Sequence, residues 1–286
     1  MKQMILLFLI TVSIFASSYN NKMLKQIEAK NLQQKNFSFV VMGDNRDGDR
    51  VLEKIINDVN KDKNIQFAIN NGDLVPDGYV KEFKYYLKKI KTSKKPIISI
   101  IGNHEIPWYD GEKNYDKTFG KTYFSFTFGN SYFIVLDDSN EKSLGKEQRQ
   151  WLIRRLKISQ NFQNRFVFMH VPLYDPRYGK YARGHSIKNI KKAKRLNDIF
   201  DKYKVTMLFC SHIHAYFRGT WHKTPFIITG GAGAPLYKYK NNAFYHYIKV
   251  SVKGKNVTYK VIKIDMKQPD FIHRSIQSIK DVLNIN

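Results

Sequence analysis

The stretch FSFVVMGDNR, residues 37–46, passes from a run of apolar residues into a Gly-Asp pair. A short apolar run that ends at Gly and Asp is typical of a buried β-strand followed by a loop. The arrangement recurs in four later stretches: IQFAINNGD (65–73), PIISIIGNHE (96–105), RFVFMH (165–170) and VTMLFCSHIH (205–214). Each predicted strand therefore delivers polar side chains to the loop that follows it.

Six of these polar residues follow the apolar runs directly: Asp44, Asp73, Asn103, His170, His212 and His214. Open α/β sheets bind their ligands beyond the carboxyl ends of their strands, so we expect the six side chains to meet there. Carboxylate, amide and imidazole groups are ligands for transition metals such as iron, zinc and manganese. The pattern predicts a metal centre that holds two ions.

The 286 residues are enough for one large α/β domain, and no Pro/Gly/Ser-rich linker divides them. Residues 1–18 carry Lys2, an apolar stretch and then small residues, which is typical of a secretory signal cleaved after Ser18. The apolar stretch is shorter than a membrane-spanning helix needs, so no stable membrane anchor is expected after cleavage. The sequence predicts a periplasmic or secreted protein with one domain over residues 19–286.

The formal net charge is +25, from 49 Lys and Arg against 24 Asp and Glu. A field of this sign attracts anions and speeds their arrival. No recognisable nucleic-acid-binding module accompanies the charge, so it does not by itself indicate DNA or RNA binding. The partner expected is a small phosphorylated anion, and the oligomeric state is left open.

Along the chain, β and helical patterns alternate up to the run at 96–101. A hairpin with a Gly129-Asn130 turn is then predicted in TYFSFTFGNSYFIVLDD, followed by further β and helical runs and an antiparallel finish up to Ile264. Two mixed β-sheets packed face to face, with helices outside both, would bury these apolar runs. We therefore expect a four-layer αββα sandwich of the α/β class, with a surface tail at 266–286.

The motifs GDNR (43–46), NGD (71–73), GNHE (102–105), MHVP (169–172) and SHIH (211–214) resemble those of the calcineurin-like metallophosphoesterase family. The stretches HAYFRG and ITGGAGAPL resemble the branch that contains the purple acid phosphatases. The resemblance extends over about residues 37–265. It implies the αββα fold and the hydrolysis of phosphoric esters at a pair of metal ions.

The resemblance also assigns roles to the residues that match the motifs. Asp73 corresponds to the carboxylate that bridges both ions, and His104 to the acid that protonates the leaving group. Asp44 and His214 would serve the first ion, and Asn103, His170 and His212 the second. Two such ions polarise a phosphoryl oxygen and activate hydroxide, while a histidine titrates in the range needed to protonate an alkoxide. Glu105 is a candidate to orient His104.

Arg46 departs from the family pattern, which has a metal-binding His at this place. A guanidinium has no free lone pair and cannot bind a cation. The tyrosine that purple acid phosphatases supply three residues after the second Gly-Asp is replaced by Pro76. One hypothesis is that Arg46 pairs with two phosphate oxygens of the substrate. Another is that the first metal binds weakly.

The function expected is therefore that of an exported metal-dependent phosphomonoesterase. Two alternatives stay open: a phosphodiesterase or nucleotidase with the same site, and a non-catalytic protein that binds phosphate or a partner at a decayed metal site.

Overall fold

A computed structural model describes residues 18–30, 35–107, 110–237, 239 and 241–266. The predicted signal peptide falls outside these residues except for Ser18, as does the tail from residue 267. None of the helices in the described ranges is long and apolar enough to span a bilayer.

The first sheet has five strands. Their order across the sheet is β11 (Asn256–Lys263), β10 (His246–Lys253), β1 (Asn36–Met42), β2 (Ile65–Asn70) and β3 (Ile97–Ser99). β1, β2 and β3 run parallel, whereas β10 pairs antiparallel with both β1 and β11. β1 therefore stands at the centre of this sheet, and the loop that follows it carries Asp44.

The second sheet has six strands. Their order is β4 (Phe124–Phe128), β5 (Ser131–Val135), β6 (Asn164–Phe168), β7 (Met207–Cys210), β9 (Thr224–Thr229) and β8 (Tyr216–Trp221). β5, β6, β7 and β9 are parallel, and β4 and β8 close the two edges with antiparallel pairs. The loops after β6 and β7 carry His170 and His212.

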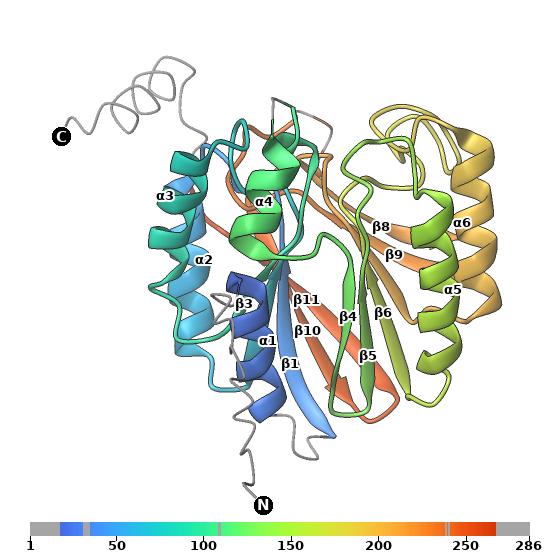
Figure 1. The fold of residues 1–286 in the computed structure, drawn as a ribbon, viewed down its shortest axis with the longest axis horizontal. Coiled ribbons are helices and arrows are strands. Elements are labelled where there is room, and N and C mark those ends of the chain that lie inside the picture. Colours follow the sequence, from blue (N-terminus) through green and yellow to red (C-terminus); the bar gives the residue numbers. More distant parts are fainter. Residues whose placement is uncertain (1–17, 31–34, 108–109, 238, 240, 267–286) are drawn as a thin grey trace, which may run out of the picture.

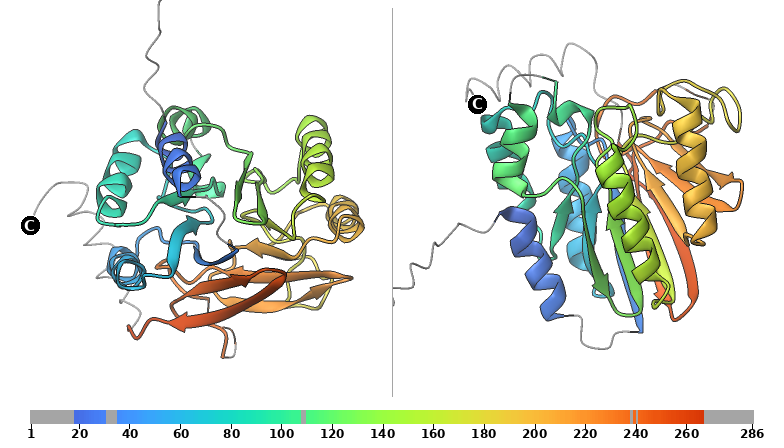
Figure 2. Two further views of the ribbon diagram at one scale, coloured as in Figure 1. Left: turned by 90° about the horizontal axis from the view of Figure 1, so that it is seen from below. Right: turned by 45° about the vertical axis from the view of Figure 1, so that its right-hand side comes forward.

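Helices lie outside both sheets (Figures 1 and 2). On the side of the first sheet are α2 (Asp49–Lys61), α3 (Val80–Ile90) and α4 (Gly111–Phe119), whereas α1 (Tyr19–Ala29) lies along β3 and β4, the edge strands of the two sheets. On the side of the second sheet are α5 (Lys146–Ser159) and α6 (Ile190–Lys202). A short 3₁₀ turn, η1 (Asn103–Glu105), follows the first sheet's edge strand β3.

Aromatic side chains fill the space between the sheets. Phe39 on β1 stacks on Phe67 of β2 with ring centroids 5.5 Å apart. It also meets Phe133 and Phe166 of the second sheet edge to face, at 5.4 and 5.1 Å. Such pairs add to the gain from burying large apolar rings, and they fix how the two sheets face each other.

The predicted four-layer α/β sandwich is confirmed. α2 spans the residues expected from its apolar spacing, and the hairpin turns at Gly129-Asn130 as predicted. β3 is shorter than the apolar run 96–101, because the chain leaves the sheet after Ser99 toward η1. α4 was not expected from the sequence.

Candidate metal centre

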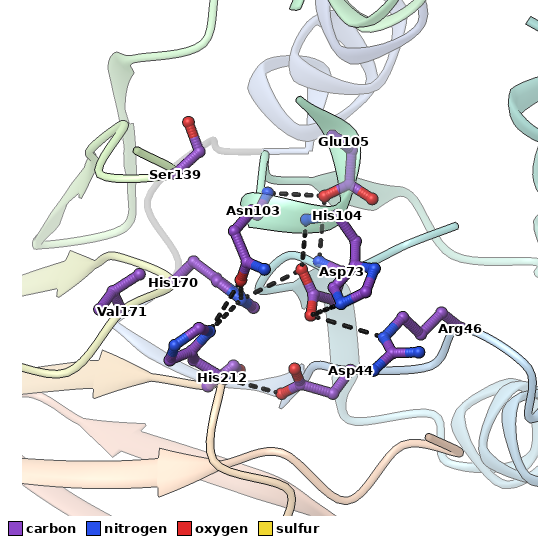
Figure 3. A network of polar contacts seen from close by, with 12 residues as sticks. Asp44, Arg46, Asp73, Asn103, His104, Glu105, Ser139, His170, Val171 and His212 are labelled. Carbon is purple, nitrogen blue, oxygen red and sulfur yellow. Dashed lines mark hydrogen bonds and ion pairs between the residues drawn. The ribbon is translucent and has the colours of Figure 1, made fainter. Parts of the chain in front are cut away.

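Loops from both sheets bring the predicted metal ligands together (Figure 3). Two groups of buried side chains have potential ligand atoms that all lie within 4.8 Å of one another. One group contains Asp44, Asp73 and His214, and the other contains Asp73, His170 and His212. Asp73 belongs to both groups. The described residues thus form two clusters, each able to hold a metal ion, that share one carboxylate.

In the first cluster, His214 Nε2 lies 3.5 Å from Asp44 Oδ1. The Asp44 carboxylate is fully buried, and its Oδ2 accepts a hydrogen bond from the backbone N–H of His212 at 2.9 Å. Its Oδ1 has no hydrogen-bond partner. Burial raises the pKa of Asp44 well above its usual range, because nothing close by fully compensates its charge.

In the second cluster, the side-chain oxygen of Asn103 lies 2.7 Å from His212 Nδ1 and 3.1 Å from His170 Nε2. His170 Nε2 is also 3.2 Å from Asp73 Oδ1. Although burial opposes it, the carboxylates of Asp73 and Asp44 raise the pKa of His170 to about 10. The uncharged side chain of Asn103 thus lies in the second cluster because its oxygen is close to both histidines.

Hydrogen bonds from the far side of two rings turn the histidines toward the centre. Nδ1 of His170 lies 2.9 Å from the carbonyl oxygen of Asn71, and Nδ1 of His214 lies 2.6 Å from that of Pro235. A ring that donates from Nδ1 keeps the lone pair of Nε2 free for a cation. Both rings thus present Nε2 to the shared centre.

The backbone is held in an unusual conformation at three of the ligands. Asp44, Asp73 and His212 have φ values of 59°, 54° and 67°, in the left-handed region that few residues other than glycine adopt. Gly72, with φ of 97°, comes so close to His170 that a Cβ there would lie 2.4 Å from its Nδ1. The loops are therefore shaped to place these side chains at the cost of local strain.

His104 stands at the edge of the site. Its Nδ1 lies 2.6 Å from the carbonyl oxygen of Pro76, and its Nε2 lies 3.9 Å from Asp73 Oδ2. The side chain is 30% exposed, in contrast to the buried rings of the two clusters. His104 therefore offers Nε2 to the open side of the centre, where a substrate would enter.

The sequence analysis gave Glu105 as a candidate to orient His104, but the structure shows other partners for Glu105. Its buried carboxylate accepts hydrogen bonds from the backbone N–H groups of Gly102, Asp73, Leu74 and Val75, at 2.6 to 3.1 Å. These bonds tie the loop after β2 to the loop after β3. Glu105 thus fixes the position of Asp73 relative to Asn103.

Arg46 lies beside the first cluster. Its Nε is 3.8 Å from Asp73 Oδ2 and has no hydrogen-bond partner, and its Nη1 pairs with Asp47 at 3.1 Å. The guanidinium contributes a fixed positive charge where the family pattern places a metal-binding imidazole. It is largely buried, so that charge acts at short range on any anion in the site.

The sequence motifs did not identify three residues that lie beside the predicted ligands. No motif marks His185, yet its ring centroid lies 3.8 Å from that of His212. Tyr237 stacks on His214 with centroids 4.8 Å apart and planes 7° from parallel. The Asp138 carboxylate accepts hydrogen bonds from the backbone N–H groups of His170 and Val171 at 2.9 and 3.0 Å. The apolar-to-polar switch after VLD (135–137) was the signal available for Asp138.

Comparison with known proteins agrees with this geometry. A model of the calcineurin-like phosphoesterase family matches residues 37–216, which is more than half of the chain. The chain belongs to this family. The residues of the two clusters that share Asp73 lie between positions 44 and 214. All of them fall within the part of the chain that the family model matches.

Several known proteins are similar to this chain in sequence. Serine/threonine-protein phosphatase CPPED1 of Rattus norvegicus is 28% identical over 163 residues, which are 52% of this chain and 51% of that protein. A "Probable cyclic nucleotide phosphodiesterase" of Xenorhabdus bovienii is 25% identical over 172 residues, or 55% of this chain and 64% of that one. The chain thus spans about half the length of the first of these relatives.

Among solved structures, a purple acid phosphatase from yellow lupin seeds superposes with a TM-score of 0.66 at 18% identity, over 80% of this chain and 52% of that one. At this identity the likeness shows a shared fold.

Proposed function

We propose that the chain is a metal-dependent phosphoric ester hydrolase that acts on phosphomonoesters with two metal ions. The observation that carries this proposal is the position of Asp73, which belongs to both ligand clusters. A shared carboxylate would help to hold two cations side by side, as in two-metal phosphatases. Iron, zinc and manganese all suit the carboxylate, amide and imidazole donors.

The residues present fit such a pair of ions. Asp44 Oδ1 is buried without a hydrogen-bond partner, and burial disfavours its charged form. His170 and His214 are buried with their Nδ1 atoms engaged by carbonyl groups. A cation would stabilise the carboxylate and accept the imidazole lone pairs, so the donor set is suited to metal rather than to a protein side chain.

In the hydrolysis itself, bound cations supply Lewis acidity that polarises the phosphoryl group and acidifies water. The chain's own residues hold and orient the ester. Arg46 offers the N–H groups of its guanidinium to the phosphate oxygens on the side of the first cluster. His104, fixed by Pro76 through Nδ1, carries a proton on Nε2 to the oxygen of the leaving group.

The relatives' names support the hydrolysis of phosphoric esters, but they differ on whether the substrate is a monoester or a diester. CPPED1 is named as a phosphatase of proteins and the Xenorhabdus protein as a cyclic nucleotide phosphodiesterase. We favour monoesters because Arg46 provides a fixed charge that matches the extra anionic oxygen of a monoester. A phosphodiesterase of the same fold is the second candidate, since the Xenorhabdus relative carries that name.

The experiment is hydrolysis of nitrophenyl phosphate and of bis(nitrophenyl) phosphate in the presence of Mn²⁺ or Zn²⁺. Faster turnover of the monoester supports the proposal, and faster turnover of the diester supports the second candidate. Asp73→Asn serves as the control, because it removes the shared charge and keeps the shape of the side chain. Activity that survives this substitution would exclude the two-metal mechanism. Absence of any turnover with either ester would favour a non-catalytic binding protein.

We also propose that the protein is exported and cleaved after Ser18. Two features support this: the signal-like composition of residues 1–18, and the start of α1 at Tyr19, so that cleavage would remove from the described fold only Ser18, the N-cap whose carbonyl accepts the Lys22 N–H. N-terminal sequencing of protein recovered from outside the cytoplasm should begin at Tyr19. An uncleaved Met1 in that fraction would contradict the proposal.

A further inference from the structure

One continuous segment beside the metal centre is strongly basic. Residues 177–195, RYGKYARGHSIKNIKKAKR, contain eight of the chain's 49 Lys and Arg and none of its 24 Asp and Glu. They comprise the loop that precedes α6 and the first part of α6 itself. Figure 1 shows this loop, in yellow, next to the upper end of α6. We call residues 177–195 the basic segment.

Most of these charges have no acidic partner. Among the residues that the structure describes, only three cations of the basic segment form ion pairs: Arg177 with Asp175, Lys188 with Glu141 and Lys194 with Asp198. The other five face solvent without a neighbouring carboxylate: Lys180, Arg183, Lys191, Lys192 and Arg195. The segment therefore presents an uncompensated positive surface.

Exposed apolar side chains lie among these cations. Tyr178, Tyr181 and Ile190 are 70%, 41% and 36% exposed, and they are three of the seven large hydrophobic side chains that the described residues expose. α6 buries Ala193, Leu196 and Phe200 against the second sheet, so its basic residues and Ile190 point outward. Cations interleaved with tyrosine and an aliphatic residue match the boundary between lipid headgroups and acyl chains.

Two residues of the basic segment, Arg177 and His185, lie close to the metal centre. His185, within it, lies against His212, and the Arg177 guanidinium lies 5.3 Å from the ring of Tyr237, which stacks on His214. Whatever binds the basic segment is thus held close to His212 and His214 of the metal centre.

We infer that the basic segment docks the protein on an anionic lipid surface and so presents membrane-associated phosphoesters to the metal centre. An anionic polymer such as nucleic acid shares the attraction to the cations, but it gains nothing from the aliphatic side chain of Ile190. A lipid surface uses both. The docking is peripheral and does not depend on catalysis, so it can be tested apart from the proposed hydrolysis.

The test is sedimentation of the full-length protein with vesicles of phosphatidylglycerol and phosphatidylcholine, and with vesicles of phosphatidylcholine alone. Each Lys or Arg near an anionic surface strengthens binding about fivefold, so the triple variant K191A/K192A/R195A should bind the anionic vesicles roughly 100-fold more weakly. Ile190→Ser, which keeps the charge, should weaken binding about tenfold.

The matched control is K84A/K88A/K91A, which removes the same charge from exposed positions on and just after α3. It should change vesicle binding by less than about threefold if the position of the charge matters rather than its total. All variants keep residues 1–17, so any contribution of that region is common to them. Hydrolysis of soluble nitrophenyl phosphate should be the same in the triple variant and the wild type.

Three outcomes would overturn the inference. The first is failure of the wild type to bind anionic vesicles. The second is an equal loss of binding in the two triple variants. The third is that Ile190→Ser binds vesicles as well as the wild type does, and that the wild type binds a single-stranded oligonucleotide more tightly than vesicles. The last outcome would assign the surface to an anionic polymer.

Discussion

Asn20 and Ser99 bind each other through two hydrogen bonds that join the N-terminal helix to the edge of the first sheet. Asn20 Nδ2 donates to the carbonyl of Ser99 at 2.8 Å, and the Ser99 N–H donates to Asn20 Oδ1 at 3.0 Å. The side-chain amide thus supplies the acceptor for a backbone N–H at the edge of β3 that would otherwise be unpaired, while the Ser99 carbonyl also accepts the hydroxyl of Tyr115. Ser99 in turn contacts Tyr86, which accepts a hydrogen bond from Asn70 at the end of β2.

Replacing this amide should destabilise the fold. In Asn20→Ala the Ser99 N–H is buried without an acceptor, whereas its carbonyl keeps the hydroxyl of Tyr115 as a donor. We expect the free energy of unfolding to fall by about 2 kcal/mol, as measured by urea denaturation. The neighbouring exposed Asn21→Ala is the control and should change it by less than about 0.5 kcal/mol. Equal effects of the two substitutions would refute the role of the amide.

Arg46 should act on the substrate. Loss of a charge-assisted hydrogen bond to phosphate costs about 1.5–3 kcal/mol, so Arg46→His should raise KM for nitrophenyl phosphate at least about tenfold. Arg46→Lys keeps the charge but loses the planar guanidinium, so its KM should lie between those of the wild type and Arg46→His. An unchanged KM in Arg46→His would show that the guanidinium does not contact the phosphate.

The same variant gives a second readout in metal content. Only Asp44, Asp73 and His214 form the first cluster in the described structure, so purified wild-type protein should hold fewer than two ions per chain after mild chelation. Arg46→His adds an imidazole there and should retain more metal by elemental analysis. Two full equivalents in the wild type would argue against a weak first site.

Metal binding should stabilise the folded chain. A ligand that binds only the native state adds about 2.7 kcal/mol at a free concentration of roughly 100 times its Kd. Titration with Mn²⁺ should therefore raise the melting temperature of the wild type, and a chelator should reverse the rise. Asp73→Asn removes the carboxylate that both clusters share and should abolish the increase. A similar increase in this variant would mean that the ions bind elsewhere.

Glu105 should be needed for the position of Asp73. A glutamine at this place has one carbonyl oxygen for four backbone N–H donors and brings an NH₂ group toward them. Glu105→Gln should lower the free energy of unfolding by about 3 kcal/mol and weaken Mn²⁺ binding. Glu112→Gln, on the exposed face of α4, is the matched control and should alter neither quantity. Normal Mn²⁺ affinity in Glu105→Gln would separate the carboxylate from the metal centre.

His246 should make stability depend on pH. It is fully buried at the start of β10, its Nδ1 facing the carbonyl of Phe244 and its Nε2 facing the hydroxyl of Thr229. Burial lowers its pKa from 6.5 to about 4, so the unfolded chain takes up a proton before the folded chain does. Stability is therefore complete above pH 6.5 and is lost as the pH falls toward 4.

From pH 7 to pH 5 this residue should account for about 2 kcal/mol of lost stability. Comparing urea denaturation of the wild type and His246→Gln at both pH values isolates the contribution, because the other buried histidines are common to both proteins. An equal loss in the two proteins would show that His246 keeps its ordinary pKa when folded.

The sequence predicted the sandwich because the parallel strands of both sheets are mostly buried apolar runs, and Gly, Asp and His mark their ends. α2 was equally clear, since Val51, Ile55, Ile56 and Val59 lie on one face and are all buried. α4 was not, because its buried residues are Gly111, Tyr115 and Phe119 in an otherwise polar segment. Its helical state depends on packing against Phe83 and Tyr86 of α3, which no local pattern reveals.

The candidate site divides in the same way. Asp44, Asp73 and the histidines after β6 and β7 follow strands, so the topology of a parallel sheet brings them together. The contact of His185 with His212 depends instead on the path of a long loop, and sequence spacing does not determine that path. The role of Glu105 was misassigned because its neighbour in sequence, His104, is not its partner in space.

The left-handed backbone at Asp44, Asp73 and His212 has a consequence for how this centre can diverge. Aspartate and asparagine adopt that conformation more readily than most residues, so an exchange between them changes the charge without rebuilding the loop. The net charge of the metal centre can therefore change by a single substitution while the backbone of its loops keeps its conformation. Members of the lineage could lose turnover and keep an intact anion receptor, and a designer could restore turnover by the reverse exchange.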